Sequence, residues 1–274
     1  MMTRMPELSR RALLGLGVGA VGACALGVGG VGTAPAAAAP TYSGGMFVSA
    51  ARGGIPTNWA IARPPGQTAP LRPIIALHGK DQSAAGVMAG GVEQGLAQAV
   101  AAGVPPVAVV AVDGGGSYWH KRASGEDAGA MVLDELIPML ATQEIDTSRV
   151  AFLGWSMGGY GALLLGSRLG PGRTAAICAV SPALWTSPGA AAPYAFDGPE
   201  DYEAHSVWGR PEFASIPIRI DCGDADPFAE ATRQFIAQLP NPPAGGFSPG
   251  GHDAGYWSSQ LPAELAWIAP LLVA

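Results

Sequence analysis

Hydrophobic and polar positions follow two patterns that alternate along the chain. Short apolar runs of four to seven residues, bounded by Gly, Pro or Asp, alternate with longer segments in which apolar residues recur every three or four positions. The first pattern is typical of strands buried on both faces, and the second is typical of helices. The apolar runs predict strands at residues 46–51, 59–63, 73–77, 107–112, 150–153, 174–180 and 216–221. The other segments predict helices at residues 83–102, 126–142, 159–169, 227–239 and 261–273.

This alternation predicts an α/β fold with a mostly parallel central sheet and helices on both of its faces. The two leading strands, 46–51 and 59–63, are expected to be antiparallel. Residues 182–211 interrupt the alternation with prolines, glycines and several aromatic side chains. Connections longer than about 15 residues usually have a function in a compact domain. We therefore expect a short cap that shapes a substrate pocket, with an ordinary long connection as the alternative.

The first 39 residues have the features of an export signal rather than of a folded segment. Residues 9–14, SRRALL, resemble a twin-arginine signal, and an uncharged stretch of Gly, Ala, Val and Leu follows them. Small residues at 34–39 predict cleavage near positions 36–39, which leaves one domain over residues 40–274. The alternatives are a retained membrane anchor and a lipid attached to Cys24. We therefore expect a secreted or envelope-associated protein.

The amino-acid composition of the chain argues against nucleic-acid and metal partners. The formal net charge is −6, with 15 Lys and Arg against 21 Asp and Glu. No nucleic-acid partner is expected, because phosphate contacts need clustered Lys and Arg. Cys178 and Cys222 lie in apolar runs and lack metal-ligand spacing, so we expect buried free thiols, with a disulfide as the alternative. Neither a metal nor another cofactor is expected.

One motif points to covalent chemistry. Residues 152–159, FLGWSMGG, contain Gly-x-Ser-x-Gly centred on Ser156. An apolar strand leads into the motif and a helix of small residues leads out, which is the context of a nucleophile elbow. Such a turn strains the serine backbone and needs glycine beside it. The alternative is a chance turn, since the chain has 40 glycines. We predict that Ser156 is a nucleophile.

A serine nucleophile needs a base and an acid, which follow the serine in the order acid, then histidine, in α/β-hydrolases. Asp221, Asp224 and Asp226 lie at the end of one predicted strand. We favour Asp226, because its side chain can fold back over the strand end from a Gly-x-x-Asp turn. Asp224 stays open, and Asp221 lies inside the strand. His252 is the only histidine after these acids, so we expect it to be the base.

The remaining parts of the site are an oxyanion hole and a pocket. The N–H groups of Met157, at the start of a helix, and of Lys80, in the loop after the third predicted strand, are the expected oxyanion donors. His78 is expected to shape that loop without transferring protons. The residues expected to line the substrate pocket are His78, Trp119, Trp155 and Trp185.

With these residues placed, the chain resembles the esterase D and antigen 85 branch of the α/β-hydrolases over roughly residues 44–272. The matching pieces are His78-Gly79, residues 154–161 (GWSMGGYG) and residues 251–257 (GHDAGYW). The resemblance implies an α/β-hydrolase sheet under a canopy, exported acyl hydrolysis or transfer, and a triad of Ser156, Asp226 and His252. The mycolyl-transferring members use glutamate as the acid and have long carbohydrate-side loops, neither of which has a clear counterpart in this chain.

These observations favour a metal-independent serine carboxylesterase that forms an acyl-enzyme from a small acyl ester or a lipid. The first alternative is an acyltransferase, similar to the mycolyltransferases, that passes the acyl group to a sugar or lipid hydroxyl. The second is a non-catalytic envelope-binding protein on the same fold. Peptidase and thioesterase activities are minor alternatives.

Overall fold

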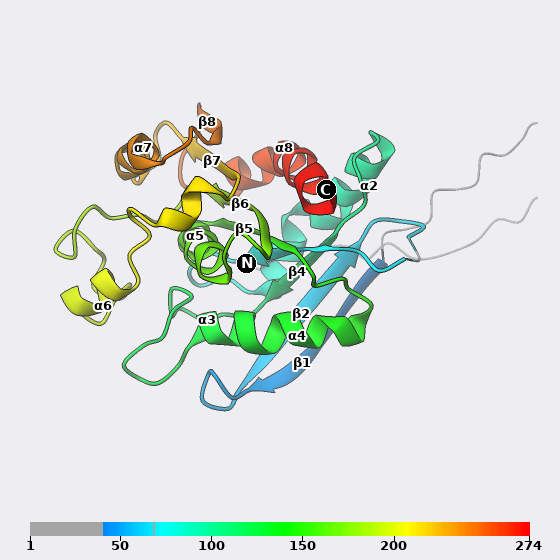
Figure 1. Ribbon diagram of the computed structural model, residues 1–274, viewed down its shortest axis with the longest axis horizontal. Helices are drawn as coiled ribbons and strands as arrows, with labels where there is room; N and C mark the ends of the chain where they lie inside the picture. Colours follow the sequence, from blue (N-terminus) through cyan, green and yellow to red (C-terminus); the bar gives the residue numbers. More distant parts are fainter. Residues whose placement is uncertain (1–40, 68) are drawn as a thin grey trace, which may run out of the picture. The chain divides into compact units, whose positions relative to one another are not determined.

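The computed structural model describes residues 41–67 and 69–274, so the expected export signal and Cys24 lie outside the described residues. One sheet with the strand order β1-β2-β4-β3-β5-β6-β7-β8 runs through this part of the chain (Figure 1). The strands are β1 (Thr41–Ser49), β2 (Ile55–Arg63), β3 (Pro73–Leu77), β4 (Ala108–Val112), β5 (Val150–Trp155), β6 (Thr174–Val180), β7 (Ile218–Gly223) and β8 (Ala244–Ser248). Strands β1, β2 and β4 pair antiparallel, and all the other pairs are parallel.

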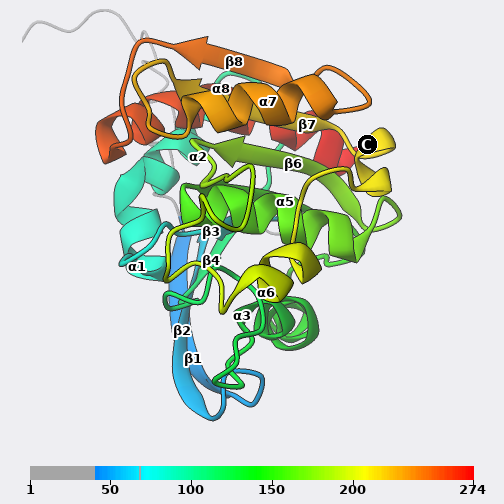
Figure 2. The same cartoon turned by 90° about the vertical axis from the view of Figure 1, so that its left-hand side faces the viewer.

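Helices cover both faces of the sheet (Figure 2). They are α1 (Ala84–Val87), η1 (Met88–Val92), α2 (Glu93–Ala101), α3 (Ala128–Ala130), η2 (Met131–Leu136), α4 (Ile137–Leu140), η3 (Ala141–Gln143), α5 (Met157–Leu169), α6 (Pro199–Ala204), η4 (Pro211–Ala214), α7 (Ala229–Gln238) and α8 (Ala254–Val273). Among the described residues, no helix has the length and hydropathy needed to cross a membrane.

Buried strand residues divide alternately between two cores, because successive side chains of a strand point to opposite faces. In β3, Ile75 and Leu77 pack in the core beneath α3, α4, α5 and α7. Ile74 and Ala76 pack in the core beneath α1, α2 and α8. The sheet is therefore covered on both sides, and the expected α/β class with an antiparallel leading pair is confirmed.

The structure also departs from the sequence-based prediction: β1 and β2 begin at Thr41 and Ile55 rather than at 46 and 59, and three other elements differ more. The helix expected at 83–102 is interrupted at Gly91, whose φ of 96° lies in the left-handed region. The last helix begins at Ala254 rather than 261, because the Asp253 side chain accepts a hydrogen bond from Tyr256 N–H (3.0 Å) and caps it. Strand β8 was not predicted, because its sequence AGGFS is too glycine-rich to show a strand pattern.

The turn at Ser156 is packed too closely for any side chain on its glycines. A Cβ atom on Gly158 would collide with the Leu77 carbonyl group, and one on Gly154 would collide with the Gly158 carbonyl group. These glycines hold the strand β5, the turn and helix α5 against β3.

We expect Gly158→Ala to lower the free energy of unfolding by about 3 kcal/mol, because the backbone must move to admit the methyl group. Urea denaturation measures this change. The control is Gly172→Ala, since a Cβ atom on Gly172 has no neighbour within 4 Å. Equal denaturation midpoints for the two variants would contradict the tight packing described for the turn.

Candidate active site

Ser156 lies between β5 and α5, at the carboxyl edge where open α/β sheets place their sites. Its φ of 56° and ψ of −121° are uncommon for a residue other than glycine. Backbone hydrogen bonds hold this conformation. Ser156 N–H donates to Val180 O (3.0 Å), and Ser156 O accepts from the N–H groups of Tyr160 (3.1 Å) and Ala183 (3.0 Å). The fold therefore fixes the serine in a strained turn above the sheet edge.

The structure brings three predicted residues into one hydrogen-bonded chain. Ser156 Oγ lies 2.9 Å from His252 Nε2, and His252 Nδ1 lies 2.8 Å from Asp226 Oδ2. Because an ionised carboxylate only accepts, Nδ1 carries the proton and donates it to Asp226. The lone pair of Nε2 then faces the serine hydroxyl. This arrangement can take the proton from Ser156 and stabilise the resulting imidazolium.

Asp226 is buried after β7, in a setting that keeps it ionised. Burial alone would raise the pKa of this carboxyl group, but hydrogen bonds from His252 and from Phe228 N–H (2.8 Å) hold the pKa below its ordinary value. Among the acids of the described residues, Asp226 alone lies within hydrogen-bond distance of His252. Asp224 is exposed and meets only Gly250 N–H, at 3.4 Å.

The loop after β3 is positioned by His78, which is fully buried. Its Nε2 accepts a hydrogen bond from Gly114 N–H (2.9 Å), and its Nδ1 lies 2.7 Å from Gly79 O. Burial lowers the pKa of His78, so the ring is neutral and Nδ1–H donates to Gly79 O. In a trans peptide the C=O and N–H groups point in opposite directions. The His78 ring therefore directs Lys80 N–H to the side of the loop away from itself.

This loop lies directly beside the serine. A Cβ atom placed on Gly79 would be 3.5 Å from Ser156 Cβ. Within residues 41–67 and 69–274, no group accepts a hydrogen bond from Lys80 N–H. Met157 is the first residue of α5, where backbone N–H groups have no acceptor within the helix. Both expected oxyanion donors thus border Ser156 with free N–H groups.

Two of the expected pocket residues have a different position. Trp119 is fully buried, 5.0 Å from the His78 ring centre in an edge-to-face arrangement. It fills the space left by Gly114 and Gly161, where a Cβ atom would overlap its ring. Trp119 and His78 therefore lie in the protein core, where their contact packs the loop after β3 against the loop after β4. The prediction that they line the pocket is wrong.

Each of the other two expected pocket residues, Trp155 and Trp185, is linked to the His252 ring through one further aromatic side chain that the sequence analysis missed. Trp185 packs edge-to-face on Phe228 at 5.5 Å, and Phe228 lies 5.2 Å from the His252 ring. Trp257 packs edge-to-face on His252 at 5.2 Å and stacks on Trp155 at 6.1 Å. The sequence did contain a signal for Trp257, because this residue belongs to the GHDAGYW motif that also contains His252.

The expected cap, residues 182–211, contains α6, ends where η4 begins, and is tied to the loop after β4. The Arg122 guanidinium donates two hydrogen bonds to Asp197 (2.7 and 3.1 Å), and Ala123 N–H donates a third (2.6 Å). These bonds lower the pKa of Asp197 to about 2. The cap is therefore anchored through a carboxylate that stays ionised at any mild pH.

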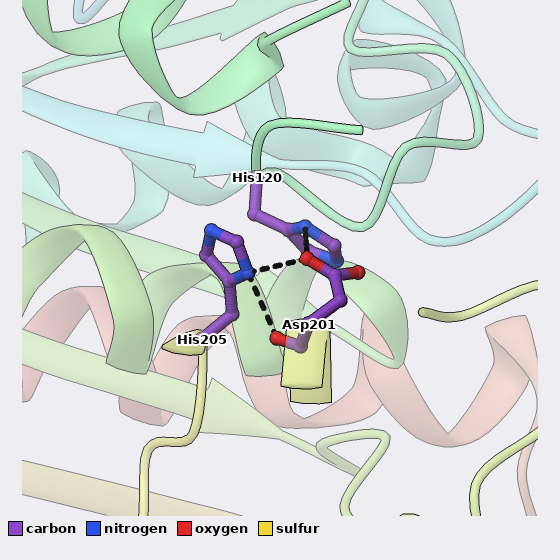
Figure 3. A group of neighbouring side chains, drawn as sticks. All are labelled: His120, Asp201 and His205. Atoms are coloured by element: carbon purple, nitrogen blue, oxygen red, sulfur yellow. Dashed lines mark hydrogen bonds and ion pairs between the residues drawn. The ribbon is translucent and has the colours of Figure 1, made fainter. Parts of the chain in front are cut away.

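A second tie is formed by His120, Asp201 and His205 (Figure 3). Asp201 Oδ1 lies 2.8 Å from His205 Nδ1 and 3.8 Å from His120 Nδ1. The donor set would suit a transition metal, but its geometry does not. The two rings stack at 4.3 Å, so their in-plane lone pairs do not converge, and both His120 nitrogens face carbonyl oxygens at 3.0 and 3.1 Å. This cluster is a contact between the cap and the body.

Cys178 and Cys222 are buried and free, as expected. Cys178 lies beside Asp221, which pairs with Arg219 (2.6 Å), and beside Glu264 of α8. Glu264 is 2 % exposed, and its Oε1 has no hydrogen-bond partner among the described residues. Burial raises the pKa of Glu264 well above its ordinary value. The carboxyl group is therefore neutral in the folded protein over a wider pH range than in the unfolded chain.

We expect this buried acid to weaken the fold as pH rises. Unfolding returns Glu264 to a pKa of about 4.3, so above that pH the unfolded chain binds fewer protons than the folded one. The free energy of unfolding then falls by about 1.4 kcal/mol per pH unit until the folded group also ionises. In Glu264→Gln this loss should be absent, so the thermal unfolding midpoint of the variant should rise relative to that of the wild type as the pH increases above 4. The exposed control Glu203→Gln should follow the wild type, and parallel curves for all three proteins would contradict a buried neutral acid.

Comparisons with known proteins agree with this architecture. A family model described as "Putative esterase" matches residues 54–268. No curated protein sequence matches the chain significantly. Among solved structures, S-formylglutathione hydrolase FrmB from Staphylococcus aureus is 17 % identical, with a TM-score of 0.69 and coverage of 84 % of this chain and 99 % of that one.

Two further solved structures are similar. MPT51 (FbpC1) of Mycobacterium tuberculosis is 19 % identical, with a TM-score of 0.67 and coverage of 85 % of this chain and 99 % of that one. The ferulic acid esterase AmCE1/Fae1A of Anaeromyces mucronatus is 18 % identical, with a TM-score of 0.67 and coverage of 85 % and 92 %. At these identities the likeness establishes the α/β-hydrolase fold.

Proposed function

This chain belongs to the esterase family and is a carboxylic ester hydrolase, and we propose that it works as a serine carboxylesterase through Ser156, His252 and Asp226. The observation that carries the proposal is the continuous hydrogen-bonded chain from Asp226 through His252 to Ser156, with separations of 2.8 and 2.9 Å. Its order along the sequence, serine then acid then histidine, is that of the α/β-hydrolases.

In the acylation half-reaction, Ser156 Oγ attacks the ester carbonyl carbon while His252 Nε2 takes the hydroxyl proton. Asp226 holds the ring in the correct tautomer and stabilises the imidazolium. The carbonyl oxygen becomes an oxyanion that accepts hydrogen bonds from the N–H groups of Met157 and Lys80. The intermediate collapses when His252 gives its proton to the leaving alkoxide, and the alcohol departs.

In the deacylation half-reaction, water attacks the acyl group on Ser156 while His252 Nε2 takes its proton. The same two N–H groups stabilise the second oxyanion. Collapse returns the proton to Ser156 Oγ and releases the carboxylic acid. No step needs a metal ion or another cofactor, since the chain's own groups move every proton.

An acyltransferase would share the first half-reaction and differ only in the acceptor. Product analysis separates the two functions. The purified protein is incubated with a p-nitrophenyl acyl ester, with and without a sugar or a long-chain alcohol. We expect free acid as the main product in both cases. A predominant new ester in the presence of the acceptor would overturn hydrolysis in favour of transfer, and no release of p-nitrophenol would favour a non-catalytic binding role.

We also propose that the protein is exported by the twin-arginine route and is secreted or held in the cell envelope. The support is the SRRALL run and the small residues at 34–39. Cell fractionation with mass analysis of the mature N-terminus should find a chain that begins near residues 36–39. Full-length protein in the cytoplasm would contradict export, and a lipid-modified Cys24 would contradict cleavage at the later site.

A further inference from the structure

A pocket that the catalytic chemistry does not use lies between the segment α1–η1 and helix α8. Its volume is about 60 Å³, within a wider depression of about 420 Å³ that is open to solvent. The side chains of its wall come from both helical segments and from the end of β5. The main ones are Val87, Val92, Trp155, Trp257, Leu261 and Glu264.

Two of these side chains join the pocket to the reacting groups. Trp155 immediately precedes Ser156 in the chain. Trp257 contacts the His252 ring edge-to-face at 5.2 Å and stacks on Trp155 at 6.1 Å. The pocket therefore shares two wall residues, Trp155 and Trp257, with the immediate surroundings of Ser156 and His252.

Two residues of the pocket wall each have a buried polar atom that the described part of the chain leaves unpaired. Trp257 Nε1 and Glu264 Oε1 are buried, and neither has a hydrogen-bond partner within the described part of the chain. Buried polar atoms of folded proteins are normally paired. Among the residues that line the pocket there is no Lys, Arg or His, and burial raises the pKa of Glu264 well above its ordinary value, which favours its neutral form. The surroundings thus disfavour a charged group and suit an apolar group with few polar atoms.

We propose that this pocket binds an uncharged, mainly apolar arm of the ester substrate. The proposal rests on the esterase function proposed above and adds the chemical class of the group that flanks the ester bond. The space open to a bound group is only about 60 Å³, well below the range for whole small-molecule sites, about 300–1,000 Å³, so the pocket admits a short chain of a few carbon atoms. The arm is either the acyl chain or the alcohol chain, and the two are separated by the test below.

Gly90 offers a way to fill the pocket without touching the reacting groups. It lines the pocket, and a Cβ atom on it would have no neighbour within 4 Å. Its φ is not positive, so a larger residue is compatible with the backbone. The test variant is Gly90→Phe. The control is Gly172→Phe, which adds the same side chain at an exposed position outside the pocket that is equally open.

The experiment compares two series of esters. The acyl series runs from p-nitrophenyl acetate to p-nitrophenyl hexanoate, and the alcohol series runs from methyl acetate to hexyl acetate. Each methylene that enters the pocket should raise kcat/KM of the wild type about fourfold. In Gly90→Phe we expect the dependence on chain length to flatten in one series, with at least a tenfold loss for the longest ester and little change for acetate. The series that flattens identifies the arm.

The outcomes distinguish the subsite from the esterase function. Unchanged length dependence in both series of Gly90→Phe, with hydrolysis that still needs Ser156, would overturn the subsite alone. A similar flattening in Gly172→Phe would also overturn it. Absence of hydrolysis of every ester by the wild type would overturn the proposed function, and the subsite with it. Thermal unfolding of both variants shows whether they fold.

Discussion

Replacing Ser156 with alanine should lower kcat for ester hydrolysis by about 10⁶. The substitution removes the only atom of the site that forms a bond to the acyl group. The remaining catalysis would come from the oxyanion donors and from substrate binding, which together still exceed the reaction in water. Release of p-nitrophenol from the acetate ester measures the change, with the enzyme concentration raised for the variant.

The fold of this variant should be intact. Within the described residues, the Ser156 hydroxyl makes one side-chain hydrogen bond, to His252, while the backbone at this position is held by Val180, Tyr160 and Ala183. The control Ser215→Ala removes an exposed hydroxyl group from the segment between η4 and β7 and should keep full activity. If kcat for ester hydrolysis fell by less than tenfold in Ser156→Ala, Ser156 would not be the nucleophile.

Replacing Asp226 with asparagine should lower kcat by about 10⁴, while Asp224→Asn should change it by less than a factor of two or three. Asparagine keeps the size of the side chain but loses its charge. Its amide group no longer favours the His252 tautomer in which Nδ1 carries the proton, and it cannot stabilise an imidazolium. The same p-nitrophenol assay measures both variants.

This pair of variants decides between the two acids that the sequence left open. Asp226 is buried and lies 2.8 Å from His252, whereas Asp224 is exposed and meets only a backbone N–H group. If Asp224→Asn were the damaging substitution, the hydrogen-bonded chain described here would not be the working one. Circular dichroism of both variants controls for misfolding.

The local part of the site was predictable because its signals lie close together in the sequence. A buried strand, a Gly-x-Ser-x-Gly turn and a helix of small residues place Ser156, since glycine is required wherever the turn meets β3. The structure then brings His252 to Ser156 across 96 residues of sequence separation, and Asp226 to His252 across 26. Chain order alone pointed to them, because the ends of parallel strands meet at one edge of the sheet.

The prediction failed where a side chain's position depends on tertiary packing. Trp119 follows a glycine-rich loop near the site, which suggested a pocket wall. It is buried because Gly114 and Gly161, far apart in the sequence, leave a space that its ring fills. Strand β8 exists because β7 offers it a partner edge, not because AGGFS favours a strand. Such features depend on neighbours that a one-dimensional pattern does not contain.

The most direct test of the central claim is to locate a covalent adduct on the protein. The wild type is treated with a fluorophosphonate, which phosphonylates activated serines, and the modified residue is identified by peptide mass spectrometry. We expect one adduct, on Ser156, with rapid formation in the wild type and strongly slowed formation in Asp226→Asn. No adduct, or an adduct on another residue of a protein that still hydrolyses esters, would contradict a nucleophile at Ser156.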